Sequence, residues 1–484
     1  MATEFEFDRR ALLKGTGSAV AALSIAGPLG MLAARQAQAA TTLGNSPYGP
    51  LSPVADVDTG LPLLQLPKGF SYRTMSWTGD LMTNGQPTHE RHDGMCCVAI
   101  GSGRAQKLVL MRNHESGTNA KFGLMGAPGK YSNASNVSGG TSNVVVQNGR
   151  YVETQPSLGG TIVNCAGGQT PWDTWLSCEE TTSTLNEPHG WVFETRPNIN
   201  EVTGNPISDM GRLRHEALAF DPGTGFAYLT EDDSGKSGLY RFEPNRPLGG
   251  AGSLEEGGKL YMAKVRGQDQ AYLNNPTIGE THTLDWVRID NPSEAPFRID
   301  EGGVNATVSG PFAQGFIQGG MRMVRGEGAW WSATDRVIYI VDTSAGGQGA
   351  LWAYDPAAST FTCVYVTSRA VAGNNPDNVT VSPRGGVLMC EDGGGVTDQF
   401  GFGERLLGLL PNGLAYPFAK NNIQLDSSDI LAAGKNPAFV SPGDYRDKEW
   451  CGACFSPDGR ILFVNIQTPG ITFAITGPWQ RGTL

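Results

Sequence analysis

Short runs of apolar and β-branched residues recur along this chain, and each one follows a turn and ends abruptly in polar or acidic residues. Almost no stretch repeats its apolar residues with the spacing of a helix, so the pattern predicts an all-β chain of short strands. Six segments share this form most clearly: 107–115, 172–180, 225–233, 336–343, 386–393 and 460–467.

Six similar strands predict a six-bladed β-propeller, in which equivalent strand ends converge on a central channel. Proline and glycine predict tight hairpins before three of these strands, at 219–223, 381–385 and 455–459. We expect long loop insertions over the propeller face at 119–143, 246–258 and 401–443. Residues 70–75 and 472–476 are expected to pair in one blade, which closes the ring and removes free sheet edges.

The first residues predict an export signal rather than a part of the fold. Arg9 and Arg10 are followed by Leu-Leu-Lys and then by a glycine- and alanine-rich stretch of moderate hydropathy. This pattern favours a twin-arginine signal over 1–39, with an ordinary signal peptide as the alternative. Residues 40–484 then form a single propeller domain, which the twin-arginine export machinery carries already folded to the periplasm or the medium. No later stretch reaches the ~18 apolar residues of a membrane helix, so we expect no membrane contact after signal removal.

Composition narrows the class of partner and the source of stability. The formal net charge of −11 argues against a nucleic-acid-binding surface, because phosphate recognition usually leaves a basic patch. Eight cysteines in a chain of 484 residues are too sparse for a disulfide-built scaffold, so packing must supply the stability. The pairing of the cysteines stays open. The chain has no conspicuous partner segment, which leaves a monomer as the default expectation.

Acidic residues gather at or beside the ends of the predicted strands. One such carboxylate alone is most simply a solvated surface charge, but a converging set repels itself unless cations bind it. With the amides of Asn113 and Asn378 it forms a hard-ligand set that suits Ca²⁺, Mg²⁺ or Fe³⁺ better than Zn²⁺. The set comprises Glu115, Glu179, Glu180, Glu216, Glu231, Asp232, Asp233, Asp377, Glu391 and Asp392.

Other chemistries lack their usual sequence signals. The chain has no His-Glu-x-x-His, no Gly-x-Ser-x-Gly and no glycine-rich phosphate loop, which disfavours zinc proteases, serine hydrolases and nucleotide-binding enzymes. The Cys-x-x-Cys at 451–454 runs straight into a hairpin rather than a helix, so a dithiol redox role is disfavoured. Cys178 stands beside two glutamates, where it is either a ligand of a transition metal such as iron or a buried structural thiol.

Several motifs together resemble the PhoX-type alkaline phosphatases. They are His-Asp-Gly-Met at 92–95, Arg-Asn-His-Glu at 112–115, the segment 174–180 ending in Cys-Glu-Glu, Gly-Arg-Leu-Arg-His-Glu-Ala at 211–217, Pro-Asp-Asn at 376–378, Cys-Glu-Asp-Gly at 390–393 and the closing segment 455–470. The resemblance spans nearly the whole predicted mature chain. It implies a six-bladed propeller that hydrolyses phosphate monoesters at alkaline pH to scavenge phosphate, with a site of calcium ions and an iron pair.

The resemblance also implies roles for individual residues. Cys178 would be an iron ligand. The further candidate metal ligands would be Glu115, Glu180, Glu216, Glu327, Asp377, Glu391 and Asp392. Arg325 and Asn113 would contact the substrate phosphate, with Lys121 or Lys130 as a third contact. Two alternatives stay open: a calcium-dependent lactonase or other esterase, and a non-catalytic binding propeller that metal ions stabilise. The number of ions and the preference among small phosphorylated substrates are beyond the sequence.

Overall fold

The computed structural model describes residues 40–119 and 121–484. The predicted signal segment 1–39 lies outside the described residues. Among the described residues, no helix has the length and apolar character that crossing a membrane requires.

Antiparallel sheets make up most of the molecule. A five-stranded sheet has the order β4-β5-β7-β8-β6, formed by His92–Ile100, Lys107–His114, Gly139–Gln147, Arg150–Thr161 and Gly129–Lys130. A three-stranded sheet has the order β11-β10-β9, formed by Val192–Thr195, Trp175–Glu179 and Asn164–Gln169. A four-stranded sheet has the order β3-β33-β32-β31, formed by Ser71–Met75, Ile471–Thr476, Ile461–Ile466 and Trp450–Phe455.

Two larger sheets complete the circle. A six-stranded sheet has the order β1-β2-β28-β27-β24-β23, formed by Leu51–Val54, Leu64–Pro67, Ala415–Asn421, Arg405–Leu409, Val387–Glu391 and Pro376–Val381. A nine-stranded sheet has the order β12-β13-β14-β15-β16-β22-β21-β20-β19, formed by His215–Asp221, Phe226–Glu231, Leu239–Pro244, Gly258–Val265, Thr281–Ile289, Thr360–Val366, Ala350–Asp355, Val337–Asp342 and Gly326–Ser332.

Short two-stranded ribbons and two short helices add to these sheets. Two-stranded ribbons pair β17 with β18, β25 with β26 and β29 with β30, formed by Phe297–Glu301, Val304–Val308, Val396–Asp398, Gly401–Gly403, Gln424–Leu425 and Gly443–Asp444. The short helices α2 and α3 are Gly310–Ile317 and Ser427–Ala432. The Ser309 hydroxyl accepts from the backbone N–H of Phe312 and so caps the start of α2.

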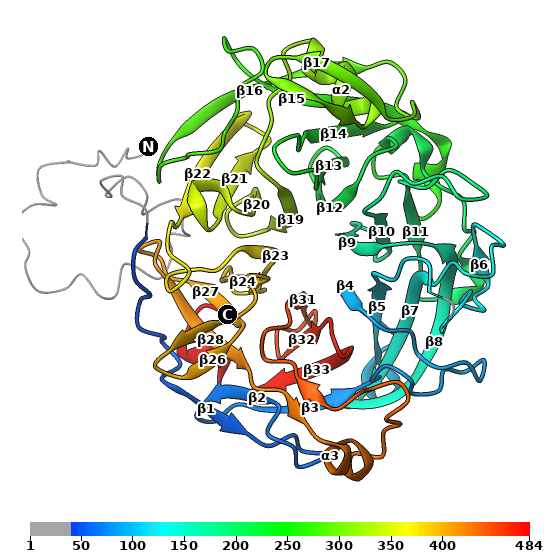
Figure 1. The fold of residues 1–484 in the computed structure, drawn as a ribbon, viewed down its shortest axis with the longest axis vertical. Helices are drawn as coiled ribbons and strands as arrows, with labels where there is room; N and C mark the ends of the chain where they lie inside the picture. The colour runs from blue at the N-terminus through cyan, green and yellow to red at the C-terminus, as the bar shows by residue number, and fades with distance from the viewer. Residues whose placement is uncertain (1–39, 120) are drawn as a thin grey trace, which may run out of the picture.

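The sheets stand around a common axis (Figure 1), and the all-β, propeller-like arrangement is confirmed. Strands β4, β9, β12, β19, β23 and β31 lie innermost, and each contacts the next until β31 returns to β4. The six repeat segments found in the sequence are the second strands, β5, β10, β13, β20, β24 and β32. The strand before each repeat segment, rather than the segment itself, lies next to the axis.

The predicted hairpins and the predicted closure are confirmed. The turns at 219–223, 381–385 and 455–459 join β12 to β13, β23 to β24 and β31 to β32. Ser71–Met75 pairs with Ile471–Thr476 in the register Ser71 to Thr476, so the third strand of the chain and the last one share one sheet. The expected loop at 401–443 is wrong in part, because it contains the sheet strands β27 and β28.

The closure is reinforced by an aromatic cluster between two neighbouring sheets. The rings of Tyr48, Phe70, Phe418 and Trp479 are buried, and the Phe70 ring lies 4.9 Å from Trp479, 5.2 Å from Phe418 and 5.4 Å from Tyr48 in edge-to-face contacts. Each such pair adds roughly 0.5–1.5 kcal/mol beyond its buried area. The Tyr48 hydroxyl also donates to the carbonyl of Trp479, so residues 431 positions apart are tied together.

Candidate metal centre

One residue of each innermost strand points into the same mouth of the propeller. It is the second residue of the strand in every case, and we call this set the inner ring. All but Asp377 are less than 5 % exposed. In order around the axis, the inner ring consists of Asp93, Cys165, Glu216, Glu327, Asp377 and Cys451.

A second set lies next to the inner ring. It is formed by the residue that follows each second strand, and we call it the outer ring. The backbone N–H of each outer-ring residue donates to the carbonyl of the residue just before the neighbouring innermost strand, over 2.8–3.3 Å in all six places. The outer ring consists of Glu115, Glu180, Asp232, Thr343, Asp392 and Gln467.

The carbonyl acceptors of these six bonds define a third set, which we call the rim positions. Each rim residue lies two positions before an inner-ring residue in sequence. The rim positions are occupied by Arg91, Val163, Arg214, Arg325, Asn375 and Glu449. Main-chain bonds therefore hold the same three positions in all six repeats, while the side chains differ.

Small residues close the axis directly below the inner ring. A Cβ added to Gly94 would lie 2.5 Å from the Cα of Ala166, and one added to Gly452 would lie 2.3 Å from the carbonyl of Asp93. Gly452 also has a φ of +61°, which favours glycine. The tight packing leaves the polar ring at the end of a closed channel rather than in an open pore.

Strand alternation explains which predicted acids reach the mouth. Neighbouring residues of a strand point to opposite sides, so the last residue of each second strand faces away from the outer ring. Glu179, Glu231 and Glu391 occupy that position, and protein donors bond their oxygens. Their outer-ring neighbours Glu180, Asp232 and Asp392 do face the site.

The three glutamates that face away from the outer ring, Glu179, Glu231 and Glu391, each have partners within the protein. Glu179 accepts from the backbone N–H of Ile162 and Gly190 and contacts Nδ1 of His189 at 2.7 Å. Glu231 accepts from the hydroxyls of Tyr240 and Ser309, and burial raises its pKa to about 7. Glu391 forms a fully buried ion pair with Arg405.

Cys178 and Asn113, which were also predicted as site residues, have their contacts within the protein. Cys178 packs in an apolar cluster with Leu176 and Val192, and burial raises the pKa of its thiol. The Asn113 amide donates to the carbonyls of Cys165 and Ala166, and its oxygen accepts from the Trp175 indole, so no group of Asn113 is left for a phosphate.

The lysines proposed as a third phosphate contact stand apart from the rings. Lys121 is exposed, and its ammonium lies 5.4 Å from the ring centres of both Phe122 and Phe439. Lys130 is exposed on β6 at the outer edge of its sheet. Asp233, also in the predicted acidic set, pairs with Lys236 at 2.6 Å.

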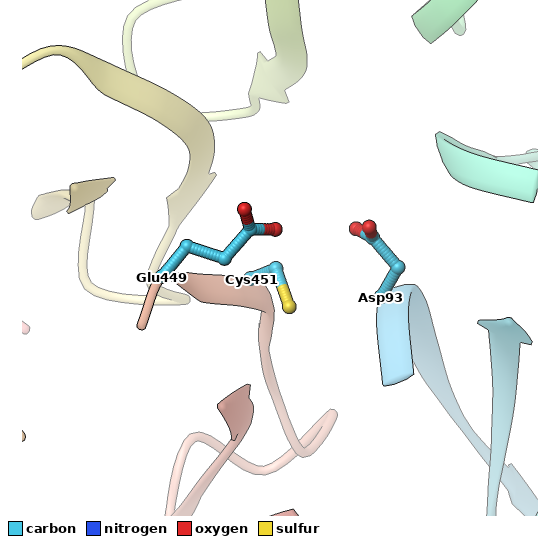
Figure 2. Close-up of side chains that lie close together, drawn as sticks. All are labelled: Asp93, Glu449 and Cys451. Atoms are coloured by element: carbon cyan, nitrogen blue, oxygen red, sulfur yellow. The ribbon is translucent and has the colours of Figure 1, made fainter. Parts of the chain in front are cut away.

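In the described part of the chain, three groups of three residues each bring their potential ligand atoms within 4.8 Å of one another. The first is Cys165 with Glu180 and Glu216, and the second is Glu216 with Glu327 and Asp377. The third is Asp93, Glu449 and Cys451. Figure 2 shows the carboxylates of Asp93 and Glu449 pointing toward one another, the first from β4 and the second from the residue just before β31.

The electrostatics of this centre favour bound cations. Burial and then neighbouring carboxylates raise the pKa of Glu180 to about 8 and of Asp377 to about 7. The pKa values of Asp93, Glu216 and Glu327 are raised well above the usual range for the same two reasons. Crowded acids of this kind stay ionised at neutral pH when cations neutralise them. Carboxylate oxygens suit calcium, and the two thiols suit a transition metal such as iron, so the donor set fits both.

Arginines from three rim positions contact the acids. Arg325 donates through Nε and Nη2 to both oxygens of Asp232, over 2.8 and 2.6 Å, and Nη2 lies 3.0 Å from Glu327. Arg91 pairs with Glu115 and Arg214 with Glu180, each at 2.7 Å. The mouth thus combines acids with guanidinium groups that match phosphate geometry.

Comparison with known proteins identifies the family to which this chain belongs. The model of the family described as alkaline phosphatase PhoX matches residues 46–157 and 136–470. The chain belongs to the PhoX alkaline phosphatase family. A comparison with curated proteins gave no match. The family is that of a metal-dependent alkaline phosphatase, in agreement with the resemblance found in the sequence.

One solved structure supports the same fold, and others are similar to a lesser degree. PhoX of Pseudomonas fluorescens, in complex with the transition-state analogue vanadate, is 18% identical, with a TM-score of 0.61 over 91% of this chain and 99% of that one. A gluconolactonase from Xanthomonas campestris is 10% identical, with a TM-score of 0.35 over 92% of this chain and 99% of that one. The calcium-binding protein regucalcin from Agrobacterium tumefaciens is 10% identical, with a TM-score of 0.32 over 76% and 91%.

Sequence reasoning missed part of the centre. No role was predicted for Asp93, Cys165, Glu449, Cys451, Arg91 and Arg214, which lie on or just before the innermost strands, outside the six repeat segments. A usable signal exists, since each innermost strand precedes a recognised hairpin or second strand. Counting back along that strand to its second residue finds the inner ring.

Proposed function

We propose that this protein is an exported, metal-dependent alkaline phosphatase that hydrolyses phosphate monoesters. The observation that carries the proposal is the pair of concentric rings at one mouth, where carboxylates and thiols meet guanidinium groups in a chain of the PhoX family. The requirement for small phosphorylated substrates follows from this combination, since cations and arginines both bind phosphate oxygens.

The proposal includes the fold and the export route. We count the repeated strand pairs around the axis as six blades of one domain over 40–484, because the outer-ring hydrogen bond recurs six times. We further propose that 1–39 is removed after twin-arginine export to the periplasm or the medium, and that the mature protein is a monomer. Mass analysis of the exported protein should find a new N-terminus at Ala40, and a retained Met1 would refute cleavage.

The donor set suggests how metals would be shared. Iron would be held by the thiols of Cys165 and Cys451 with their neighbouring carboxylates, and calcium by the all-carboxylate positions. Glu115, Glu180, Glu216, Glu327, Asp377, Asp392 and Asp232 remain candidate ligands from the sequence, and Asp93 and Glu449 join them. Bound cations would supply charge neutralisation for the phosphate and activation of a nucleophilic oxygen.

The chain's own residues then bind and orient the substrate. Arg325 is held at its backbone by Asp342, whose carboxylate accepts from the N–H groups of Val324 and Arg325 at 3.0 and 2.9 Å. The side chain is fixed by the two bonds to Asp232, while its Nη1 has no protein acceptor among the described residues. Arg325 is therefore positioned to grip a phosphate oxygen and to stabilise charge that develops in the transition state.

The test is phosphate release from p-nitrophenyl phosphate at alkaline pH by the purified mature protein, with calcium added or chelated and with iron measured by elemental analysis. Calcium-dependent release with bound iron would support the proposal. An Arg325→Ala variant should lose roughly 10²–10³-fold in kcat/KM, as removal of one preorganised donor does elsewhere. Arg246→Ala, which removes an exposed pair with Glu256, is the matched control. A folded, fully metal-loaded protein that releases no phosphate would refute the proposal.

A further inference from the structure

Arg91 and Arg214 occupy rim positions that are equivalent to the position of Arg325 in other repeats. In all three cases the arginine is the residue before an innermost strand, its carbonyl accepts the outer-ring N–H, and an inner-ring acid follows two residues later. The acids in question are Asp93, Glu216 and Glu327. Three guanidinium groups therefore stand in equivalent places above the same ring.

Arg91 and Arg214 are less engaged than Arg325. Arg91 contacts Glu115 through Nη1 alone, and Arg214 contacts Glu180 through Nη2 alone, in the part of the chain that the structure describes. Their side chains are 47 % and 45 % exposed, against 32 % for Arg325. Each ion pair joins a half-exposed arginine to an acid that is only 13–15 % exposed, so a bound anion can reach the guanidinium from the solvent side.

The two arginines differ in their place around the ring. Arg214 precedes β12, which is the direct neighbour of β19, the strand that follows Arg325. Arg91 precedes β4, which lies three strands from β19 in either direction and so on the opposite side (Figure 1). An anionic group held by Arg214 lies on the side of Arg325, and one held by Arg91 lies across the mouth.

We propose that Arg91 and Arg214 bind a second anionic group of the substrate, so that the site favours phosphate esters that carry another phosphate or a carboxylate. The inference rests on the proposed phosphatase function. Arg214 serves substrates whose two anionic groups are close together, and Arg91 serves those with a longer spacer. Guanidinium groups suit both anions, because their paired N–H donors match carboxylate and phosphate oxygens.

Two matched substrate pairs test the inference with the metal-loaded mature protein. Glycerol 2-phosphate and glycerate 2-phosphate differ by a carboxylate next to the ester carbon, and fructose 6-phosphate and fructose 1,6-bisphosphate differ by a distant phosphate. Arg214→Gln should lower the ratio of kcat/KM for glycerate 2-phosphate to kcat/KM for glycerol 2-phosphate about tenfold or more. Arg91→Gln should lower the ratio for fructose 1,6-bisphosphate to fructose 6-phosphate by a similar factor. The magnitude follows because a hydrogen bond to a charged group contributes about 1.5–3 kcal/mol.

Arg246→Gln is the matched control, because Arg246 is also a half-exposed arginine with a glutamate partner but follows β14 at the face away from the rings. Calorimetry gives a readout independent of turnover, namely the affinity for methylenediphosphonate divided by the affinity for methylphosphonate. This affinity ratio should fall in Arg214→Gln. Metal content is measured for each variant.

The outcomes separate the two proposals. Unchanged ratios in both variants, or an equal loss for all four substrates that follows metal loss, would overturn the role of the rim arginines while leaving the phosphatase standing. No phosphate release from any of the four substrates by the metal-loaded wild type would overturn both.

Discussion

Glu391 and Asp392 are neighbours in sequence, yet the structure gives them opposite roles. Glu391 is fully buried and accepts from Nε, Nη2 and the backbone N–H of Arg405, as well as from the N–H of Asn374. Asp392 belongs to the outer ring, where Glu449 and other carboxylates surround it. Replacing each acid by its amide therefore changes different properties.

The expected magnitudes follow from burial. Glu391→Gln leaves the Arg405 guanidinium buried with its main partner uncharged, and breaking such a pair costs about 3–5 kcal/mol. For a folded unit of this size, with an unfolding entropy of about 0.9 kcal/mol/K, the loss lowers Tm by about 3–5 °C. Asp392→Asn removes one of several mutually repelling charges, so the metal-free protein should change by less than about 1 kcal/mol.

Thermal unfolding in EDTA and metal analysis of the untreated protein distinguish these effects. We expect Glu391→Gln to lower the Tm in EDTA, and Asp392→Asn to leave that Tm unchanged or higher while the bound calcium or iron decreases. Equal Tm losses in EDTA for both variants would refute the reasoning that strand alternation separates a structural acid from a metal-facing one. A normal metal content in Asp392→Asn would remove it from the ligand set.

Two further predictions follow from the same centre. Burial and neighbouring acids raise the pKa of Glu180 to about 8 and of Asp377 to about 7, so the metal-free folded state holds more protons than the unfolded state above about pH 4.5. Stability in EDTA should therefore fall between about pH 5 and pH 8 and recover when calcium is added, and a flat or rising Tm over that window would contradict this. Cys165→Ser and Cys451→Ser should each lower bound iron, whereas Cys178→Ser should keep the iron and lose about 1–3 kcal/mol of stability, because it buries a hydroxyl in an apolar cluster. Iron loss in Cys178→Ser alone would reverse these roles.

The sequence predicts the fold well because the repeated strand has a strong local signal. The second strand of each repeat is an apolar run between a turn and a polar end, as in Val337–Asp342, and its hairpin carries proline and glycine. The innermost strands are harder to find. Asn164–Gln169 and Gly326–Ser332 contain glycines and small residues that bring the backbones close to the axis, so they lack an apolar pattern.

The ligand set could be predicted only in part, and strand alternation is the reason. Acidic pairs such as Glu179 and Glu180 look alike in sequence, but one residue of each pair must face away from the mouth. The direction depends on where the strand ends, which is the least certain feature of a sequence pattern. Cys178 stands next to such a pair and packs into the core, whereas Cys165, among small residues, has no acidic neighbour in sequence and lies beside Glu216.

The repeated hydrogen bonds also explain how a symmetric scaffold can carry an asymmetric site. Because the bonds between outer-ring N–H groups and rim carbonyls use only main-chain atoms, Thr343 and Gln467 can replace acids without loss of the frame. The thiols of Cys165 and Cys451 come from β9 and β31, the two neighbours of β4, while Arg325 precedes β19 on the other side. The soft ligands and the principal guanidinium thus lie on opposite sides of the ring. If the protein is the proposed phosphatase, a phosphate held by Arg325 would present its other oxygens to cations across the mouth, so that guanidinium and cations stabilise its charge from two sides.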